Sequence, residues 1–315
     1  MPEYLLSVDG GGTQTEFCIS DINGNIIKSF FSGCTNYKSV GKEIFFKNLK
    51  KGFDNITEDL NIDCTDLAYV VFGISGCDSK NDYDLISNQI KKLNLPKEKF
   101  YLCNDAVLAF YAQAEEPGIV IISGTGSIVL GIGKNGEIGR VGGWGYNFSD
   151  LGSGYWIGNE ALKRTLLYCD NCYEYSTLYD EVRKYFNSKS FNELPYKITG
   201  ITNYYEIAKV AEIVGLLADK GENISKEILK EGASYLCAFT ERVYMNLGFL
   251  NENTINIVFS GGVLKSSYYK RILKDMIIKN INESKINFII QENSPAYGGI
   301  KYAKRRYSRC IKDEK

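Results

Sequence analysis

The chain has 315 residues, of which 44% are hydrophobic, and a net charge of −1 at pH 7, so it suits two domains with ordinary cores and gives no electrostatic basis for binding nucleic acid or an anionic membrane surface. It contains no histidine, which excludes hydrolysis by a serine or cysteine nucleophile with a histidine base unless another chain supplies that residue. No apolar stretch approaches the length of a membrane-spanning helix, the first residues lack signal-peptide character and the nine cysteines are widely scattered, so we expect a cytoplasmic protein with reduced thiols.

The first half of the chain begins with three predicted strands. Apolar residues alternate over residues 4–9 and 16–20, and a third strand is predicted at 26–31. A glycine turn, Gly10-Gly11-Gly12-Thr13, joins the first two strands, and an Asn23-Gly24 hairpin signal joins the second to the third. Helices and strands then alternate at about 38–60 (helix), 67–72 (strand), 83–93 (helix), 100–103 (strand) and 106–114 (helix).

The second half repeats this order with more helix inserted. Strands are predicted at 119–123, 128–132 and 138–141, joined by the glycine turn Gly124-Thr125-Gly126-Ser127 and an Asn135-Gly136 hairpin signal. The elements that follow are helices at 155–168, 179–186, 204–220 and 224–247, a strand at 255–259, a helix at 268–281, a strand at 288–290 and a helix from 296. Two such copies predict a duplicated α/β fold with domains at 1–117 and 118–315, the last helix packing back on the first domain.

The two glycine turns are matching features, since each lies between two strands. A dinucleotide-binding fold would open a helix directly after its glycines, and a Walker loop would end in Gly-Lys-Ser/Thr, so neither motif is present. Glycine N–H groups that no Cβ shields can instead approach phosphate oxygens. A tight turn without a ligand is the alternative for either turn alone, whereas two turns in matching contexts favour phosphate binding.

Asp105 is the candidate for proton transfer. It lies between the predicted strand at 100–103 and the predicted helix at 106–114, and ligands of α/β sheets collect at the carboxyl ends of strands. A single Asp that orients an attacking hydroxyl suits phosphoryl transfer, whose loose transition state depends mostly on positioning and charge neutralisation. A role as helix N-cap, for Asn104 or for Asp105 itself, is the alternative.

Several short segments occur in a specific order and spacing: Asp9-Gly10-Gly11-Gly12-Thr13, Thr35-Asn36 with Gly41, Asn104-Asp105-Ala106, Ser123-Gly124-Thr125-Gly126-Ser127, Gly142-Gly143-Trp144-Gly145, Ser149-Asp150-Leu151-Gly152-Ser153 and Gly261-Gly262. With these segments the chain resembles, over nearly its full length, the N-acetylglucosamine kinase branch of the BadF/BadG/BcrA/BcrD ATPase family, within the sugar kinase, Hsp70 and actin superfamily. The resemblance implies two ribonuclease H-like domains around a cleft, ATP with Mg²⁺, transfer of the γ-phosphate to the 6-hydroxyl of an amino sugar, and a homodimer.

The resemblance also implies roles for individual residues. Asp9 would hold Mg²⁺ through water, and Asp105 would be the catalytic base. The residues that would bind the nucleotide are Gly11, Gly12, Thr13, Gly124, Thr125, Gly126, Ser127, Gly261 and Gly262. Those that would contact the sugar are Asn36, Ser75, Gly76, Asp105, Gly143, Trp144, Gly145 and Asp150.

The sugar residues also make chemical sense by themselves. Trp144 lies in a glycine-rich loop that presents an aromatic ring, and Asp150 can accept hydrogen bonds from two adjacent sugar hydroxyls. Each has a structural alternative: Trp144 as a core residue at a domain junction, Asp150 as the N-cap of a helix beginning near Ser153, and Asn36 as a turn residue.

Other functions differ from a kinase in the residues that they require. An ATPase activator of a 2-hydroxyacyl-CoA dehydratase or benzoyl-CoA reductase needs cysteines for an iron–sulfur cluster at a dimer interface, and the cysteines here are scattered; a sensor has no need of Asp105. Cys169 and Cys172 have metal-ligand spacing, but without a second pair or a histidine we expect surface thiols. The sequence leaves the acceptor open among N-acetylglucosamine, N-acetylmuramic acid and glucosamine.

Overall fold

The computed structural model describes residues 3–281 and 285–313, and the chain divides into two compact units. The first unit contains residues 1–115 and 291–315, and the second contains residues 116–290. Residues 291–315, which the predicted boundary assigned to the second domain, are therefore part of the first unit.

A five-stranded mixed sheet forms the centre of the first unit. Its strands are β1 (Tyr4–Gly10), β2 (Gln14–Asp21), β3 (Ile26–Gly33), β4 (Leu67–Ile74) and β5 (Phe100–Cys103), in the spatial order β3-β2-β1-β4-β5. The pairs β1–β2 and β2–β3 are antiparallel, as the predicted hairpins require, and β4 and β5 run parallel to β1. Every residue of β4 is buried, because helices cover both faces of the parallel part of the sheet.

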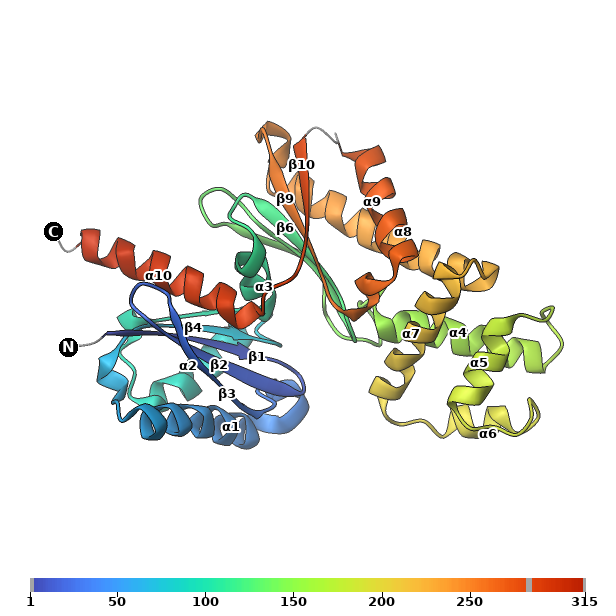
Figure 1. Cartoon of the computed structure of the whole chain (residues 1–315), viewed down its shortest axis with the longest axis horizontal. Helices are drawn as coiled ribbons and strands as arrows, with labels where there is room; N and C mark the ends of the chain where they lie inside the picture. Colours follow the sequence, from blue (N-terminus) through green and yellow to red (C-terminus); the bar gives the residue numbers. More distant parts are fainter. Residues whose placement is uncertain (1–2, 282–284, 314–315) are drawn as a thin grey trace. The chain divides into compact units, whose positions relative to one another are not determined.

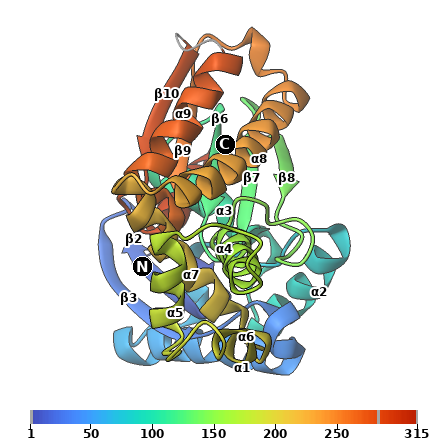
Figure 2. The same ribbon diagram turned by 90° about the vertical axis from the view of Figure 1, so that its right-hand side faces the viewer.

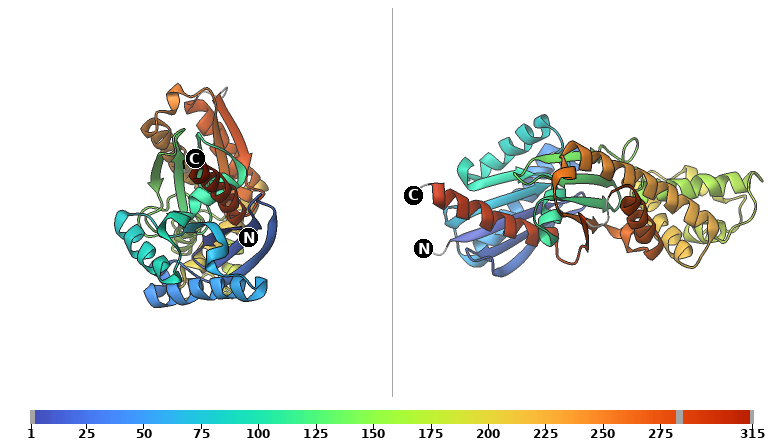
Figure 3. Two further views of the ribbon diagram at one scale, coloured as in Figure 1. Left: turned by 90° about the vertical axis from the view of Figure 1, so that its left-hand side faces the viewer. Right: turned by 90° about the horizontal axis from the view of Figure 1, so that it is seen from above.

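Four helices cover this sheet: α1 (Tyr37–Leu60), α2 (Lys80–Ile90), α3 (Asp105–Gln113) and α10 (Pro295–Asp313). Apolar residues of α1 and α2 share one core cluster with one face of the sheet, while α10 packs beside α3 and against β1 and β4 (Figures 1 and 3). Buried apolar side chains of α10, those of Ala296, Ile300 and Ala303, recur at helical spacing. This apolar stripe explains why the last helix belongs to the first unit.

The second unit repeats the sheet of the first. Its strands are β6 (Gly118–Ser123), β7 (Ser127–Ile132), β8 (Ile138–Gly142), β9 (Ile255–Ser260) and β10 (Ile286–Ile290), in the spatial order β10-β9-β6-β7-β8. Strands β6, β7 and β8 are antiparallel neighbours, and β9 and β10 are parallel to β6. Because strand order and direction match those of the first sheet, the predicted duplication is confirmed.

The second unit contains the helices α4 (Gly154–Cys169), α5 (Thr177–Tyr185), α6 (Leu194–Thr199), α7 (Tyr204–Asp219), α8 (Asn223–Asn246) and α9 (Ser267–Asn280). The additional helices are among α4 to α8, between β8 and β9, whereas α9 has the place that α2 has in the first unit. Helices α8 and α9 share a core with the sheet, and α4 to α7 pack against one another (Figure 2). Our sequence analysis missed α6, whose short span begins Leu194-Pro195 and shows no extended apolar period. Among residues 3–281 and 285–313, no helix is both long and apolar enough to span a bilayer.

Candidate active site

The first glycine turn closes the β1–β2 hairpin, as expected. The turn residues are 11–13, since Gly10 ends β1, and the N–H of Gly11 donates to the carbonyl of Gln14 at 3.0 Å. The hydroxyls of Thr15 and Thr35 lie 2.9 Å apart, and the N–H of Ser75 donates to the carbonyl of Gly10 at 2.8 Å. The strand ends that flank the turn are therefore bonded to the segments of Asn36 and Ser75, which carry predicted sugar contacts of this unit.

Carboxylates gather at this end of the first sheet. Asp9 lies near the end of β1, and burial together with the negative charges of Asp105 and Glu16 raises the pKa of its carboxyl to about 8. Burial is the larger cause of this rise and the two neighbouring carboxylates add to it, so a cation close to Asp9 would favour the ionised form of its carboxyl.

Asp105 is the first residue of α3, directly after β5. The N-cap is Asn104, whose Oδ1 accepts from the N–H of Ala106 at 3.0 Å; Asp105 Oδ1 lies 3.1 Å from the same N–H. Of the two sequence alternatives, Asn104 takes the cap position and leaves Asp105 as the acidic residue of the first turn. This geometry holds the Asp105 carboxylate at the carboxyl end of the parallel strands.

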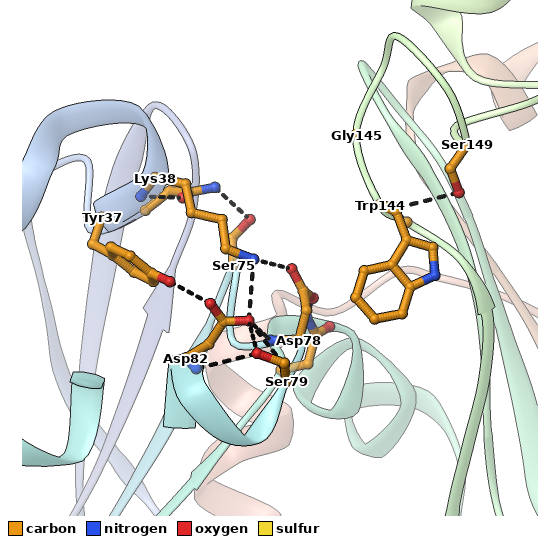
Figure 4. Close-up of polar contacts among 12 residues, drawn as sticks. Tyr37, Lys38, Ser75, Asp78, Ser79, Asp82, Trp144, Gly145 and Ser149 are labelled. Carbon is orange, nitrogen blue, oxygen red and sulfur yellow. Dashed lines mark hydrogen bonds and ion pairs between the residues drawn. The ribbon is translucent and has the colours of Figure 1, made fainter. Parts of the chain in front are cut away.

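Three predicted sugar contacts of the first unit, Asn36, Ser75 and Gly76, lie together. Asn36 is the N-cap of α1, and its Oδ1 accepts from the N–H of Lys38 at 3.1 Å while its Nδ2 donates to Ser75 Oγ at 3.3 Å. Asn36 Oδ1 also lies 2.9 Å from where a Cβ on Gly76 would stand. Figure 4 shows this region around Ser75 with the ion pairs described further below. The turn alternative for Asn36 is thus replaced by a cap that reaches across to the end of β4.

In the second unit the glycine turn is bonded to the segment that follows Asp150. The Gly124 carbonyl accepts from the N–H of Gly154 at 2.7 Å, and Ser127 Oγ donates to the carbonyl of Leu151 at 2.8 Å. A Cβ on Gly126 would lie 2.5 Å from Asp150 Oδ2, so only glycine allows this carboxylate to approach the turn. The second glycine turn and Asp150, a predicted sugar contact, therefore pack directly against each other.

Asp150 is not a helix N-cap and Trp144 is not a core residue, so neither has the purely structural role considered as its alternative. Ser153, not Asp150, is the N-cap of α4, and Asp150 Oδ1 instead accepts from the N–H of Gly145 at 3.0 Å. Trp144 is 59% exposed, so it is not a core residue. The backbone N–H of Trp144 donates to Ser149 Oγ at 3.3 Å, which closes the loop on itself (Figure 4).

Arg140 also shapes this loop, and our sequence analysis missed it. Its Nη2 donates to the carbonyls of Gly142 and Gly143 at 2.9 and 2.8 Å, and its guanidinium stacks on the Trp144 ring at 4.1 Å. An Arg at the end of a weak predicted strand, four residues before an aromatic, was the available signal.

A cavity of about 690 Å³ opens beside the second glycine turn. Its volume falls within the range of about 300–1,000 Å³ that is typical of small-molecule sites. Of the predicted nucleotide ligands, Gly124, Thr125 and Gly262 line it, while Gly261 packs behind, where a Cβ would lie 2.3 Å from the Ser123 carbonyl oxygen. The other lining residues are Gly154, Tyr205, Ala208, Lys209, Ala211, Glu212, Gly215, Leu216, Asp219, Val263, Lys265 and Ser266.

Helix α7, which our sequence analysis did not include in the site, forms one wall of this cavity. Its small residues Ala208, Ala211 and Gly215 share the cavity-lining face at helical spacing, and this was the available signal. Asp219 at its end accepts from Ser266 Oγ at 3.0 Å and from the N–H of Tyr268 at 2.7 Å, which fixes α7 to the start of α9.

A stack of tyrosines joins the cavity to the Trp144 loop. Tyr205 of the cavity wall stacks on Tyr204 at a centroid distance of 4.2 Å, Tyr204 stacks on Tyr146 at 4.6 Å, and Tyr146 contacts Tyr155 edge-on at 4.8 Å. No local sequence pattern predicts this stack, because its members come from three separate segments.

Metal binding by protein groups alone has no support in the described part of the chain, where no three or more Asp, Glu, Cys or His side chains are arranged around a common ion position. Cys169 is half-buried, Cys172 is exposed, and both are free thiols, in line with the expected surface thiols. A divalent cation would have to take oxygen ligands from a bound phosphate and from water, which is the usual coordination of Mg²⁺.

Known proteins resemble this chain over most of its length. The sequence model of the BadF/BadG/BcrA/BcrD ATPase family matches residues 6–303. An N-acetylmuramic acid/N-acetylglucosamine kinase from Clostridium acetobutylicum is 32% identical over 307 residues, covering 95% of this chain and 97% of the relative. An N-acetyl-D-glucosamine kinase from Dictyostelium discoideum is 30% identical over 294 residues, covering 90% of this chain and 91% of the relative.

A solved structure shares the fold. The crystal structure of a candidate N-acetylglucosamine kinase from Chromobacterium violaceum superimposes with a TM-score of 0.71 at 18% identity, covering 96% of this chain and 99% of that one. The match of a family model to nearly the whole sequence, together with two relatives of 30% identity or more, leads to one conclusion: the chain belongs to the BadF/BadG/BcrA/BcrD ATPase family.

Proposed function

We propose that this protein is an ATP-dependent amino-sugar kinase that phosphorylates the 6-hydroxyl of N-acetylglucosamine or a related hexosamine. The observation that carries the proposal is the cavity of about 690 Å³ beside the second glycine turn, with Asp150 of the neighbouring loop held against that turn. Relatives of similar length that are kinases of N-acetylglucosamine or N-acetylmuramic acid support the substrate class.

The cavity of the second unit is the proposed nucleotide site. The base and ribose would lie against α7 and residues 262–266, and the backbone N–H groups of the Gly124 to Ser127 turn would contact the phosphates. Gly11, Gly12 and Thr13 of the first unit are proposed as further phosphate contacts. Because glycine has no Cβ, a phosphate oxygen can come within hydrogen-bond distance of its backbone N–H.

Asp9, near the end of β1, is the residue that we propose for Mg²⁺. Asp9 has a raised pKa because burial and the charges of Asp105 and Glu16 disfavour its ionised form, and a cation would relieve that repulsion. Asp9 would hold the ion through water, and the ion would neutralise charge on the transferred phosphate.

Asp105 is the proposed base. As the sugar 6-hydroxyl oxygen forms its bond to the γ-phosphorus, the bond from that phosphorus to the ADP oxygen breaks, and the hydroxyl proton moves to the Asp105 carboxylate. The proposed sugar contacts are Asn36, Ser75 and Gly76 in the first unit and Gly143, Trp144, Gly145 and Asp150 in the second. Their amide, hydroxyl and carboxylate groups match the hydroxyls and acetamido group of a hexosamine.

A coupled assay of ADP release across N-acetylglucosamine, N-acetylmuramic acid, glucosamine and glucose tests the proposal. We expect sugar-dependent ADP release with at least one amino sugar, and phosphorus NMR of the product should show coupling to the two protons on carbon 6. ATP hydrolysis that no sugar stimulates would overturn the proposal, and iron–sulfur absorption after anaerobic purification would favour the activator instead.

A further inference from the structure

A compact cluster of one lysine and two aspartates lies beside the predicted sugar contacts of the first unit. Lys38 Nζ lies 2.9 Å from Asp78 Oδ2 and 3.1 Å from Asp82 Oδ2 (Figure 4). The aspartate side chains are 10% and 8% exposed, whereas that of Lys38 is 41% exposed. We call Lys38, Asp78 and Asp82 the Lys38 cluster.

Asp82 binds the loop between β4 and α2. Its Oδ2 accepts from the N–H of Asp78 at 3.1 Å, from the N–H of Ser79 at 2.8 Å and from Ser79 Oγ at 2.8 Å, and its Oδ1 accepts from the hydroxyl of Tyr37. The same loop begins with Ser75 and Gly76. Asp82 thus fixes the loop that carries two of the proposed sugar contacts.

Asp78 extends the cluster to the segment of the proposed base. Its Oδ1 accepts from Asn104 Nδ2 at 3.0 Å, although the two residues are 26 positions apart. Asn104 uses its other side-chain atom, Oδ1, to cap α3 at the N–H of Ala106, so both ends of its amide are fixed. The peptide bond of Asn104 leads directly into Asp105.

Lys38 connects the cluster to the third segment. Its backbone N–H donates to Asn36 Oδ1, and its ammonium binds Asp78 and Asp82 from the same residue. One ion-paired cluster therefore ties together the loop of Asn36, the loop of Ser75 and Gly76, and the start of α3 with Asp105.

The energetics favour a role in positioning over one in stability. Withdrawing a carboxylate from water has a desolvation cost that an ion pair with a partly exposed lysine offsets only in part, so the ion pair of Asp78 with Lys38 adds little net stability. Charge-assisted hydrogen bonds are short and directional, however, and they restrict the segments that they join.

We infer that Asp78 is a positioning residue for phosphoryl transfer: through Asn104 and Lys38 it holds the proposed base and the acceptor-binding loops in register. This inference rests on the proposed function, since it concerns the acceptor site of that kinase. Asp78 itself contacts neither phosphate nor the reacting atoms in this account.

The variant Asp78→Asn tests the inference because it keeps the shape of the side chain but removes its charge. We expect kcat/KM for the amino sugar to fall about 10- to 100-fold, with the KM for ATP changed by less than about twofold, since small displacements of reacting groups have effects of this size. The matched control is Asp59→Asn, which removes the exposed ion pair of Asp59 with Lys28 in the same unit and should leave both parameters unchanged.

A second pair of variants covers the case in which Asp78→Asn folds poorly. Lys38→Met should lower kcat/KM for the sugar in the same direction, and Lys38→Arg, which keeps the charge, should recover most of it; all rates are divided by the concentration of nucleotide-binding protein. Unchanged sugar kinetics in both Asp78→Asn and Lys38→Met would overturn the inference, as would an equal rise in the KM values for sugar and ATP.

The wild-type assay separates this inference from the proposed function. If the wild-type chain phosphorylates an amino sugar and the variants behave like Asp59→Asn, the kinase assignment stands and the role of Asp78 is wrong. If the wild-type chain phosphorylates no sugar, the proposed function itself fails, whatever the variants do.

Discussion

At the scale of single residues, the N-caps of α3 and α4 are neighbours of the two aspartates that we propose for catalysis and sugar binding. Asn104 caps α3 and Ser153 caps α4, so Asp105 and Asp150 are not needed for capping. Asp150 accepts from the loop N–H of Gly145 instead, and Asp105 adds its charge to the surroundings of Asp9. In both places the N-cap is a residue close in sequence to the carboxylate and not the carboxylate itself.

The variant Asp105→Asn should lower kcat by about 100-fold or more, the range associated with loss of a general base. Binding of ATP and sugar, measured by calorimetry, should change little because the amide keeps the size of the carboxylate. Asp54→Asn, which disrupts only an exposed helical ion pair with Lys50, is the control. Turnover close to the wild-type value in Asp105→Asn would show that another group takes the proton.

Asp82 gives a pH dependence of stability. Burial by itself would raise its pKa, but hydrogen bonds from Tyr37, Ser79 and Lys38 outweigh burial and lower the pKa to about 2. The unfolded chain titrates near its ordinary value of about 4, so the stabilisation is present above pH 4 and is lost as the pH falls toward 2.

We therefore expect Asp82→Asn to lower the free energy of unfolding by about 2 kcal/mol at pH 7, with a difference from the wild type that shrinks between pH 4 and pH 2. Urea unfolding at a series of pH values measures this difference. A difference that stays constant down to pH 2 would contradict the lowered pKa.

At the scale of elements, the packing of α4 against α7 shapes one wall of the proposed nucleotide site. A Cβ on Gly158 of α4 would lie 2.0 Å from the carbonyl oxygen of Ile207 in α7. Because α7 lines the cavity, the absence of this one side chain determines how closely the wall approaches the Gly124 turn.

Gly158→Ala should destabilise the protein by about 1–3 kcal/mol, the usual cost of overpacking, and should raise the Kd for nucleotide. Thermal unfolding and nucleotide titration measure the two effects. Gly200→Ala is the matched control, since a Cβ there would lie 3.6 Å from its nearest neighbour, the Tyr196 carbonyl oxygen. If Gly158→Ala binds nucleotide as tightly as the control Gly200→Ala, the proposed role of α7 in nucleotide binding is wrong.

At the scale of the whole molecule, one topology is used twice and each copy has its own apolar core. The chain leaves the first unit after residue 115 and returns to it at residue 291. The cavity is lined only by residues of the second unit, so a nucleotide should affect the local stability of that unit's site first. The homodimer stays a prediction, which light scattering can measure.

Hydrogen exchange should locate the nucleotide by segment. With an ATP analogue and Mg²⁺ at about 100 times Kd, exchange at residues 124–127, 205–219 and 261–266 should slow by up to about 100-fold. Residues 26–33 of β3, an edge strand of the first sheet, provide the reference and should show no change. Protection limited to segments outside the cavity would contradict the proposed site.

The sequence by itself determined most helices and strands, both glycine turns and the duplication, because apolar period and turn chemistry act over a few residues. It also supported the grouping of Asn36 with Ser75 and Gly76, although only through a family resemblance. The short helix α6 was not predicted, because its six residues are too few to show the apolar period of a helix.

The tertiary structure decided which residues meet. The α7 wall of the cavity, the contact of Asp78 with Asn104 and the return of α10 to the first unit all join residues far apart in the chain. No local pattern encodes such contacts, since they depend on how closely packed elements bring side chains of separate segments together. The sequence thus predicted the glycine turns that suit phosphate, and only the folded chain showed what surrounds them.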